Sequence, residues 1–311
     1  MSETKIYDVL IIGGGPGGYT AALYCARAGM TVLVLEKLTP GGQMATTGEI
    51  DNYPGFENGV DGFELAMKMQ AGAHRFGVET VLAQVTAAHL TESPKRLETT
   101  GGEYLGRAVI IAAGAYPREL GVAHENELRG RGVTYCATCD GMMFRGKEVA
   151  VVGGGNSAVA DALVLAKLCK KVTLIHRRDS LRASKVYLEG LKKSGIDIRW
   201  NSRVTELLYG QRLHGLRLTD TVTGAESELS CEGLFIAVGR VPDTELFRGQ
   251  LDMDEAGYLL ADETTRTKIP GVYAVGDVRK KPLRQIVTAT ADGAVASHFI
   301  EEYLMEGELA R

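Results

Sequence analysis

Two cysteines stand three positions apart in the segment YCATCDG, at Cys136 and Cys139. Such a Cys-x-x-Cys pair is either half of a structural zinc site or a dithiol that is oxidised and reduced as a unit. Structural zinc needs four ligands, and the sequence offers neither a second Cys-x-x-Cys nor two closely spaced histidines. The spacing therefore favours redox chemistry and predicts no metal site.

The other three cysteines, Cys25, Cys169 and Cys231, stand far from this pair and from one another. We expect them to be inert core thiols, because free cysteine behaves as a small apolar residue. An odd total of five without dense spacing does not fit a disulfide-stapled secreted fold. No apolar run is long enough to span a membrane, and the N-terminus carries acids where a signal peptide would be basic, so we expect a cytoplasmic protein.

The chain has 311 residues, which predicts two domains, and a formal net charge of -4, which gives no basic field to attract nucleic acid. It contains 39 glycines, well above the ~7% of an average protein. Many of these glycines fall in two clusters. Each cluster occurs where a turn between a strand and a helix is expected.

The first cluster lies in IYDVLIIGGGPGGYTAALYCARAGMTVLVLEK, which has the order strand, turn, helix and strand. Gly13, Gly15 and Gly18 fill the pattern G-x-G-x-x-G, in which backbone N–H groups and a helix N-terminus bind a pyrophosphate. Glu36 ends the second strand, 18 residues beyond Gly18, where a carboxylate accepts hydrogen bonds from ribose hydroxyls. This unit predicts FAD or NAD.

The second cluster repeats the unit in KEVAVVGGGNSAVADALVLAKLCKKVTLIHRRDSLRAS. Gly153, Gly155 and Ala158 form the variant G-x-G-x-x-A. The position equivalent to Glu36 is followed by cations, and these residues are His176, Arg177, Arg178 and Arg182. Guanidinium groups bind a 2′-phosphate that a carboxylate would repel, so this turn predicts NADP.

The two halves of the chain share one plan. Each contains a βαβ unit, a small sheet, and an apolar strand that ends at glycine, IIAAGA in one half and LFIAVGR in the other. The tail adds a strand, GVYAVGD, and a helix rich in small residues. Two dinucleotide sites and a cysteine pair predict electron transfer between two cofactors and a disulfide.

These motifs together resemble the bacterial low-molecular-weight thioredoxin reductases, of the class II pyridine nucleotide-disulfide oxidoreductases, over essentially the whole length. The matching segments are GGGPGG at 13–18, GGQ at 41–43, DNYPGF at 51–56, CATCDG at 136–141, GGGNSA at 153–158, HRRDSLRA at 176–183, GD at 276–277 and RQI at 284–286. The resemblance implies an α/β protein with two Rossmann-like, three-layer ββα domains, the second inserted in the first. It places an FAD domain at residues 1–117 and 246–311 and an NADPH domain, carrying the disulfide, at 118–245.

The resemblance also implies the two cofactor sites. For FAD the matching residues are Gly13, Gly15, Gly18, Glu36, Gly42, Gln43, Asn52, Asp277, Arg284, Gln285 and Ile286. For NADPH they are Gly153, Gly155, Asn156, Ser157, Ala158, His176, Arg177, Arg178 and Arg182.

By the same resemblance Cys136 and Cys139 form the redox-active disulfide. Cys139 is the cysteine nearer the flavin, Cys136 attacks the disulfide of thioredoxin, and Asp140 is the proton donor. The family further implies a homodimer and a rotation between two domain orientations. We expect its hinges near Pro117 and between Gly239 and Thr244.

Three departures from the family pattern bear on function. Met142 and Met143 stand before Phe144, where aromatic residues often help to grip thioredoxin. Ala113 replaces a common threonine, and the helix segment AVADA has alanine where an acid is frequent. The first departure leaves the partner open: a reductase of another thioredoxin-like or peroxiredoxin-type carrier remains an alternative.

Other enzymes of related architecture remain as further alternatives. An FAD-dependent dithiol oxidase needs no NADP site, and a ferredoxin-NADP reductase lacks the cysteine pair. A redox sensor without enzymatic activity has little use for all three features. The retention of both turns and of Cys136 and Cys139 favours the disulfide reductase.

Overall fold

The computed structural model describes residues 5–47 and 49–309, and the chain divides into two compact units. Unit 1 comprises Met1–Tyr116 and Val241–Arg311, and unit 2 comprises Pro117–Arg240. The chain crosses between them at β9 (Ala115–Pro117) and β18 (Arg240–Pro242), which pair in a two-stranded sheet. The second unit is thus inserted in the first, as the family resemblance implied for the fold.

Unit 1 is built on one large sheet with the strand order β5-β2-β1-β8-β7-β6, and β19 also pairs with β8. Its strands are β1 (Ile6–Ile12), β2 (Val32–Glu36), β3 (Glu49–Ile50), β4 (Val60–Asp61), β5 (Glu79–Leu82), β6 (Val85–His89), β7 (Lys95–Thr99), β8 (Gly102–Ile111) and β19 (Val272–Ala274). Its helices are α1 (Pro16–Arg27), α2 (Gly62–His74) and α6 (Ile286–Leu309), with 3₁₀ turns η1 (Gly42–Thr46), η3 (Glu245–Phe247) and η4 (Gly276–Val278).

The central strands of this sheet are parallel and apolar on both faces. Strand β1 pairs with β2 on one side, where Val9 lies opposite Val32, and with β8 on the other, where Ile12 lies opposite Ile111. Leu10 and Ile11 point to opposite faces and are both fully buried, each burial stabilising the fold by ~1.5–3 kcal/mol. Both faces of the sheet are therefore covered.

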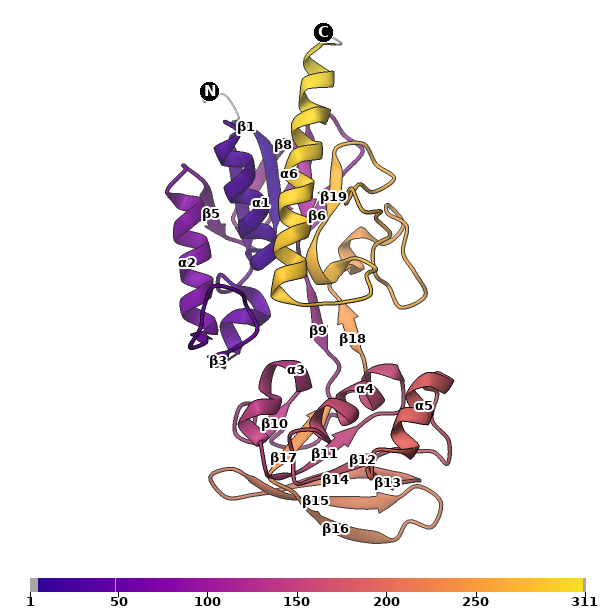
Figure 1. Ribbon diagram of the computed structural model, residues 1–311. Coiled ribbons are helices and arrows are strands. Elements are labelled where there is room, and N and C mark those ends of the chain that lie inside the picture. The colour runs from indigo at the N-terminus through magenta and orange to yellow at the C-terminus, as the bar shows by residue number, and fades with distance from the viewer. Residues whose placement is uncertain (1–4, 48, 310–311) are drawn as a thin grey trace. The chain divides into compact units, whose positions relative to one another are not determined.

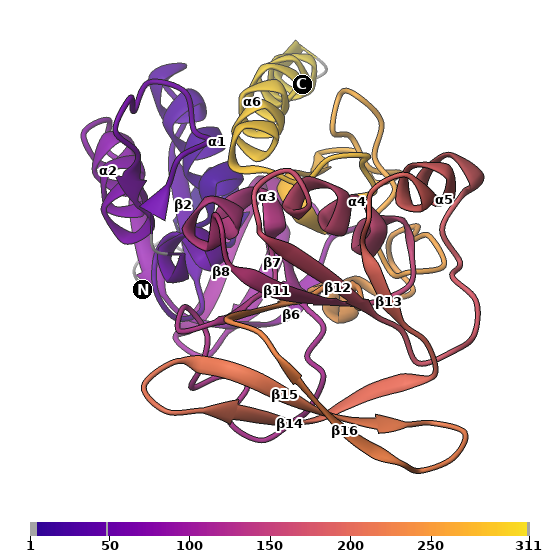
Figure 2. The ribbon, with the colours of Figure 1, turned by 60° about the horizontal axis from the view of Figure 1, so that its bottom comes forward.

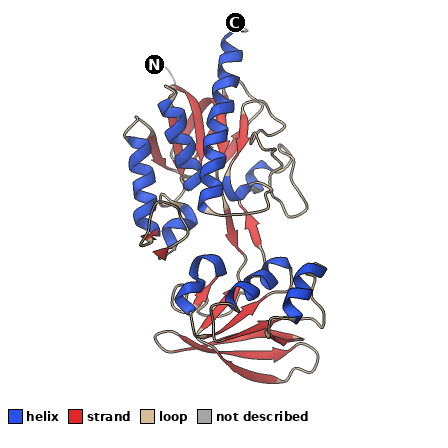
Figure 3. Ribbon diagram, in the orientation of Figure 1, coloured by secondary structure: helices blue, strands red, loops and turns tan. Residues whose placement is uncertain are grey.

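Within unit 1, α1, α2 and α6 lie on one side of the sheet (Figure 1). Helices α1 and α6 pack closely because glycines face each other: a Cβ on Gly293 would lie 2.4 Å from the carbonyl oxygen of Gly17. The antiparallel strands β6 and β7 continue the sheet beyond β8, and together with the segment around Phe247 they pack on the other face of the parallel strands. This is a three-layer ββα arrangement, visible by element type in Figure 3.

Unit 2 repeats the plan with a parallel sheet of order β10-β17-β11-β12-β13 and an antiparallel sheet β14-β15-β16. Its strands are β10 (Val133–Thr134), β11 (Glu148–Val152), β12 (Lys171–Ile175), β13 (Asp197–Arg199), β14 (Ser202–Tyr209), β15 (Leu213–Asp220), β16 (Glu226–Ser230) and β17 (Gly233–Ile236). Its helices are α3 (Ala137–Asp140), α4 (Asn156–Leu165) and α5 (Lys185–Lys192), with a 3₁₀ turn η2 (Gly141–Phe144).

In unit 2 the helices and the antiparallel sheet cover opposite faces of the parallel sheet (Figure 2). Val151 and Phe235 pack toward the helices, while Ala150 and Leu234 pack toward the antiparallel sheet. The predicted fold class, two Rossmann-like three-layer domains, is confirmed. Among the described residues, no helix combines the length and apolarity that a membrane crossing requires.

Candidate active site

The first glycine turn joins β1 to α1 and leaves an open space at the helix N-terminus. A Cβ on Gly18 would lie 2.0 Å from the carbonyl oxygen of Gly13, so this glycine allows helix and strand to touch. A Cβ on Gly15 would meet no atom within 4 Å. Helix α1 has Pro16 in its first turn, no capping side chain and no acid there. Its free N–H groups and dipole fit a pyrophosphate in that space.

Glu36 ends β2 beneath this turn. Its carboxylate accepts hydrogen bonds from the N–H of Gly14 at 2.7 Å and of Leu38 at 3.1 Å. The residue is 9% exposed. A carboxylate accepts up to about four hydrogen bonds, so Glu36 keeps capacity for a ribose hydroxyl.

The other residues expected at this site surround the same end of the sheet. A Cβ on Gly42 would lie 3.9 Å from the Cα of Gly15, so η1 borders the turn. The side chain of Gln43 donates to the carbonyl oxygen of Ala115. The side chain of Asn52 donates to that of Gln285 at 3.0 Å, which ties a loop near η1 to the start of α6.

Asp277 lies half-buried in η4, directly after β19. Arg284 donates to the carbonyl oxygens of Asp277 and Arg279 and lies 3.8 Å over the ring of Tyr258. Ile286 begins α6 and packs beside a small cluster that includes Met44. These residues therefore lie near the carboxyl ends of parallel strands, where doubly wound sheets bind ligands.

A buried ion cluster that sequence reasoning missed holds η4 in place. Asp292 of α6 accepts hydrogen bonds from the N–H of Gly276, from Arg279 and from Lys281. Burial alone would raise the pKa of Asp292, but the hydrogen bonds from Arg279 and Lys281 outweigh it and lower that pKa. Its position in the helix could have revealed this residue, since Asp292 falls on the buried face of α6 between Ala289 and Ala296.

The second turn, in unit 2, has the same geometry. A Cβ on Gly153 would lie 2.5 Å from the Cβ of Ala158, and a Cβ on Gly155 would meet nothing within 4 Å. Helix α4 begins at Asn156 with no capping side chain and no acid in its first turn, which includes Ser157. The side chain of Asn156 instead accepts the N–H of Ser184 at 2.8 Å.

At the end of β12, His176 is buried, whereas the arginines that follow it are exposed. His176 is 6% exposed, and a Cβ on Gly154 would lie 2.1 Å from its Cε1 atom, so the ring packs under the turn. Burial lowers the pKa of His176, and the neighbouring arginines lower it further. The ring therefore supports the turn rather than facing solvent.

Arg177, Arg178 and Arg182 are exposed. The N–H of Arg182 donates to the carbonyl oxygen of Gly154 at 2.7 Å, so the arginine loop folds back onto the turn. Within the described part of the chain none of the three guanidinium groups forms an ion pair. Unpaired guanidinium groups beside an anion-binding turn fit a 2′-phosphate.

Cys136 and Cys139 form a disulfide, with Cα atoms 5.3 Å apart, on the same unit as the second turn. Cys136 caps the short helix α3, and its sulfur accepts the N–H of Cys139 at 3.2 Å. The hydroxyl of Thr138 lies 3.4 Å from the same sulfur. In the reduced state these polar groups would stabilise a thiolate on Cys136.

Asp140 follows the disulfide directly and is half-buried. Burial raises the pKa of its carboxyl, against the lowering effects of Thr134 and Arg129. The hydroxyl of Thr134 donates to one carboxylate oxygen. A carboxyl with a raised pKa, one residue from the redox pair, can hold and release a proton.

The remaining cysteines have no such surroundings. Cys25 and Cys231 are buried, and burial raises the pKa of each thiol to about 12. Cys169 is only half-buried, and burial raises its pKa as well. Among the described residues no group of histidines, cysteines and acids could hold a metal ion.

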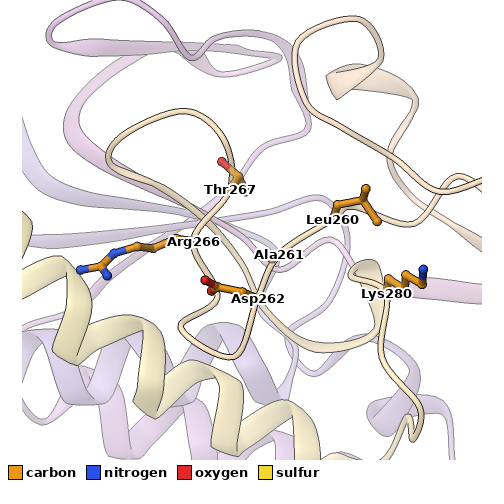
Figure 4. A pocket seen from close by; sticks show the side chains of 6 residues that line it. All are labelled: Leu260, Ala261, Asp262, Arg266, Thr267 and Lys280. Carbon is orange, nitrogen blue, oxygen red and sulfur yellow. The ribbon is translucent and has the colours of Figure 1, made fainter.

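A pocket in unit 1 adjoins Arg279 of the ion cluster, which donates to the carbonyl oxygens of Ala261 and Asp262 in the pocket lining. It is lined by Leu260, Ala261, Asp262, Arg266, Thr267 and Lys280. The Arg266 and Lys280 side chains point to opposite sides of it, so their charges do not converge (Figure 4). Arg266 also donates a hydrogen bond to the carboxylate of Glu302 on α6.

Comparison with known proteins places this geometry in a family. The family model described as pyridine nucleotide-disulphide oxidoreductase matches residues 7–293, and the chain belongs to this family. Its relatives place it among the thioredoxin reductases of that family. These enzymes use FAD and NADPH, so the two glycine turns fit the cofactors of the family.

Individual relatives are similar over nearly the whole chain. A thioredoxin reductase of Listeria monocytogenes is 46% identical over 307 residues, covering 98% of this chain and 96% of that protein. One of Bacillus subtilis is 45% identical over 308 residues, covering 98% and 97%. The crystal structure of a thioredoxin reductase from Streptococcus pyogenes superimposes with a TM-score of 0.90 at 42% identity, covering 97% of this chain and 99% of that one.

Proposed function

We propose that this protein uses NADPH to reduce the disulfide of thioredoxin through the Cys136–Cys139 pair. The observation that carries the proposal is the disulfide itself, which lies in the same unit as a turn flanked by unpaired arginines. Its relatives, named thioredoxin reductases, support the same activity.

In this proposal unit 1 binds FAD and unit 2 binds NADPH. The N–H groups around Gly15 bind the FAD pyrophosphate, while Glu36 and Asp277 accept hydrogen bonds from the hydroxyl groups of the cofactor. The N–H groups around Gly155 bind the NADPH pyrophosphate, and Arg177 and Arg178 bind its 2′-phosphate. FAD held by these residues would supply two-electron transfer between the nicotinamide and the disulfide.

The protein's own sulfur chemistry balances as follows. The Cys136 thiolate attacks one sulfur of the thioredoxin disulfide, and the other thioredoxin sulfur leaves as a thiolate. The Cys139 thiolate then attacks the Cys136 sulfur, which restores the Cys136–Cys139 disulfide and releases the dithiol of thioredoxin. Asp140 moves a proton at these sulfurs, because burial raises the pKa of its carboxyl and lets it hold a proton more readily than an ordinary aspartate.

The cysteine pair must exchange electrons with FAD in one step and with a protein substrate in another. We therefore propose that the two units change orientation during turnover, with hinges at β9 and β18, where the chain crosses. A crosslink between the units should abolish steady-state turnover and leave one half-reaction intact. Undiminished turnover of the crosslinked protein would contradict the rotation. A cytoplasmic location and a homodimer belong to the same proposal.

The deciding experiment follows NADPH oxidation by the FAD-loaded protein with and without oxidised thioredoxin, and repeats it with NADH. We expect strong stimulation by thioredoxin and a preference for NADPH. Cys139→Ser should keep NADPH-dependent flavin reduction and lose thioredoxin reduction. NADPH oxidation that thioredoxin does not stimulate would point instead to another disulfide carrier or to oxygen as acceptor.

A further inference from the structure

Trp200 is the single tryptophan of the sequence and lies directly after β13 in unit 2. The residue is 38% exposed, and its neighbours Arg199 and Asn201 are polar. A partly exposed indole ring offers an aromatic surface on which a planar molecule can stack. The position of this ring relative to the second glycine turn indicates what that molecule is.

Backbone hydrogen bonds hold Trp200 beside residues 177–182, the segment that carries the three arginines. Strands β12 and β13 are parallel, with Ile175 opposite Arg199, and the N–H of His176 donates to the carbonyl oxygen of Arg199 at 2.9 Å. On the other side of Trp200, the N–H of Asn201 donates to the carbonyl oxygen of Arg178 at 3.2 Å. Trp200 is therefore held at the same sheet edge as the arginines.

The side chain is oriented by His176. The two rings meet edge to face, with centroids 6.4 Å apart and an interplanar angle of 80°. An edge-to-face contact occupies at most one face of the indole ring, so the other face is not used by His176. Because His176 also packs under Gly154, its imidazole ring contacts both the turn and the indole ring.

The residues next to the ring in the two neighbouring segments indicate the kind of ligand. Arg177, Arg178, Arg182 and Arg199 are exposed, and none of them forms an ion pair within the residues that the structure describes. An aromatic face offers stacking to a nucleobase, and guanidinium groups offer hydrogen bonds to a phosphate. An adenosine with a phosphate on its ribose satisfies both at once.

We propose that the Trp200 ring stacks on the adenine of the 2′-phosphorylated nucleotide that binds at the second turn. This inference rests on the proposed NADPH site and assigns one of its contacts. It separates two roles: Trp200 contributes to any adenine nucleotide, whereas Arg177 and Arg178 contribute only to those with a 2′-phosphate.

Because Trp200 is the only tryptophan, its fluorescence reports on this position alone. The FAD-loaded protein is titrated with adenosine 2′,5′-bisphosphate, which has no nicotinamide and transfers no hydride. We expect saturable quenching of the tryptophan emission. Binding by calorimetry without any change in emission would overturn the inference and leave the NADPH site standing, whereas no binding at all would overturn both.

Variants supply the second test. Trp200→Ala should raise the Kd of adenosine 2′,5′-bisphosphate and of 5′-AMP by the same factor, about tenfold, and Trp200→Phe should restore most of the affinity. Arg178→Gln should weaken only the bisphosphate. Tyr209→Ala is the matched control, since Tyr209 lies in the same unit and is also 38% exposed. A Kd for Trp200→Ala within twofold of the parent, with the fold intact by circular dichroism, would refute the stacking role.

Discussion

Arg279 donates hydrogen bonds from Nε and Nη2 to the two carboxylate oxygens of Asp292, at 3.0 Å each, in the interior of unit 1. The side chains are 6% and 9% exposed. Lys281 donates to the same carboxylate at 2.7 Å, and so does the N–H of Gly276 at 2.8 Å. One carboxylate thus fixes the loop that carries Asp277 to the helix α6.

We predict that Asp292→Asn lowers the free energy of unfolding by ~3–5 kcal/mol, because it leaves two buried cations without their counter-charge. The same change should weaken FAD retention, since η4 loses its anchor. Unfolding in denaturant and the FAD content after dialysis measure the two effects. Glu302→Gln, which breaks the exposed pair with Arg266, is the control and should cost less than ~1 kcal/mol. Equal losses in both variants would contradict the structural importance of the cluster.

The stability difference should depend on pH in a defined direction. The folded-state pKa of Asp292 lies below its ordinary value of 3.8, so the ionised form is favoured by folding. The stabilisation is therefore fully present above this ordinary value and is lost as pH falls through the lower, folded-state pKa. We expect the parent and Asp292→Asn to converge in stability only in that acidic range. Convergence near neutral pH would disprove the assignment.

Sequence patterns located both glycine turns because the close approach of Gly18 to Gly13, and of Ala158 to Gly153, demands small residues at fixed spacing. They did not locate Asp292, because its partners Arg279 and Lys281 lie in a loop whose path depends on tertiary packing. They grouped His176 with the arginines, although the buried run of β12 continues through it. Residues that a local backbone turn requires can be predicted from their spacing in the sequence. Residues that pair with one another across loops can be identified only once the fold is known.

Because the space at each helix N-terminus is open, a methyl group added there should weaken cofactor binding without destabilising the fold. Gly155→Ala places a Cβ where no protein atom lies within 4 Å, at a φ of -98° that alanine adopts freely. We expect the free energy of unfolding to change by less than ~1 kcal/mol and the KM for NADPH to rise at least about tenfold, because the methyl group blocks the approach of the pyrophosphate.

Gly15→Ala should produce the reciprocal result, with FAD affinity reduced and the Kd of adenosine 2′,5′-bisphosphate unchanged. Gly210→Ala, also in open space, is the control and should affect neither ligand. Calorimetric binding of each ligand to each variant distinguishes these cases. If Gly155→Ala weakened FAD and spared NADPH, the assignment of the two turns would be reversed.

Asp140 should set one limb of the pH profile for disulfide reduction. Since burial raises the pKa of its carboxyl, that limb should lie above the ordinary value of 3.8. Asp140→Asn should lower the rate about 100-fold and remove the limb, while NADPH binding stays unchanged. Thr134→Val removes a hydrogen bond that favours the carboxylate, so it should move the limb to higher pH. A shift to lower pH, or none, would exclude Asp140 as the titrating group.

The surface beside the disulfide should determine how well thioredoxin binds. Met142 and Met143 are each 50% exposed, whereas Phe144 is 4% exposed and packs edge to face on Phe235. The two methionines therefore present flexible apolar side chains next to the cysteines, and Phe144 belongs to the core.

We predict that the double change Met142→Ala and Met143→Ala raises the KM for thioredoxin about tenfold, because it removes apolar contact area. The kcat with a small-molecule disulfide should stay unchanged, since such a substrate needs no docking surface. Met305→Ala is the matched control, because Met305 is 53% exposed but lies on α6 of the other unit. Steady-state kinetics with both substrates measure the effect. An unchanged KM for thioredoxin would mean that the carrier docks elsewhere on the surface, and a loss with the small disulfide too would mean that the methionines support the redox pair itself.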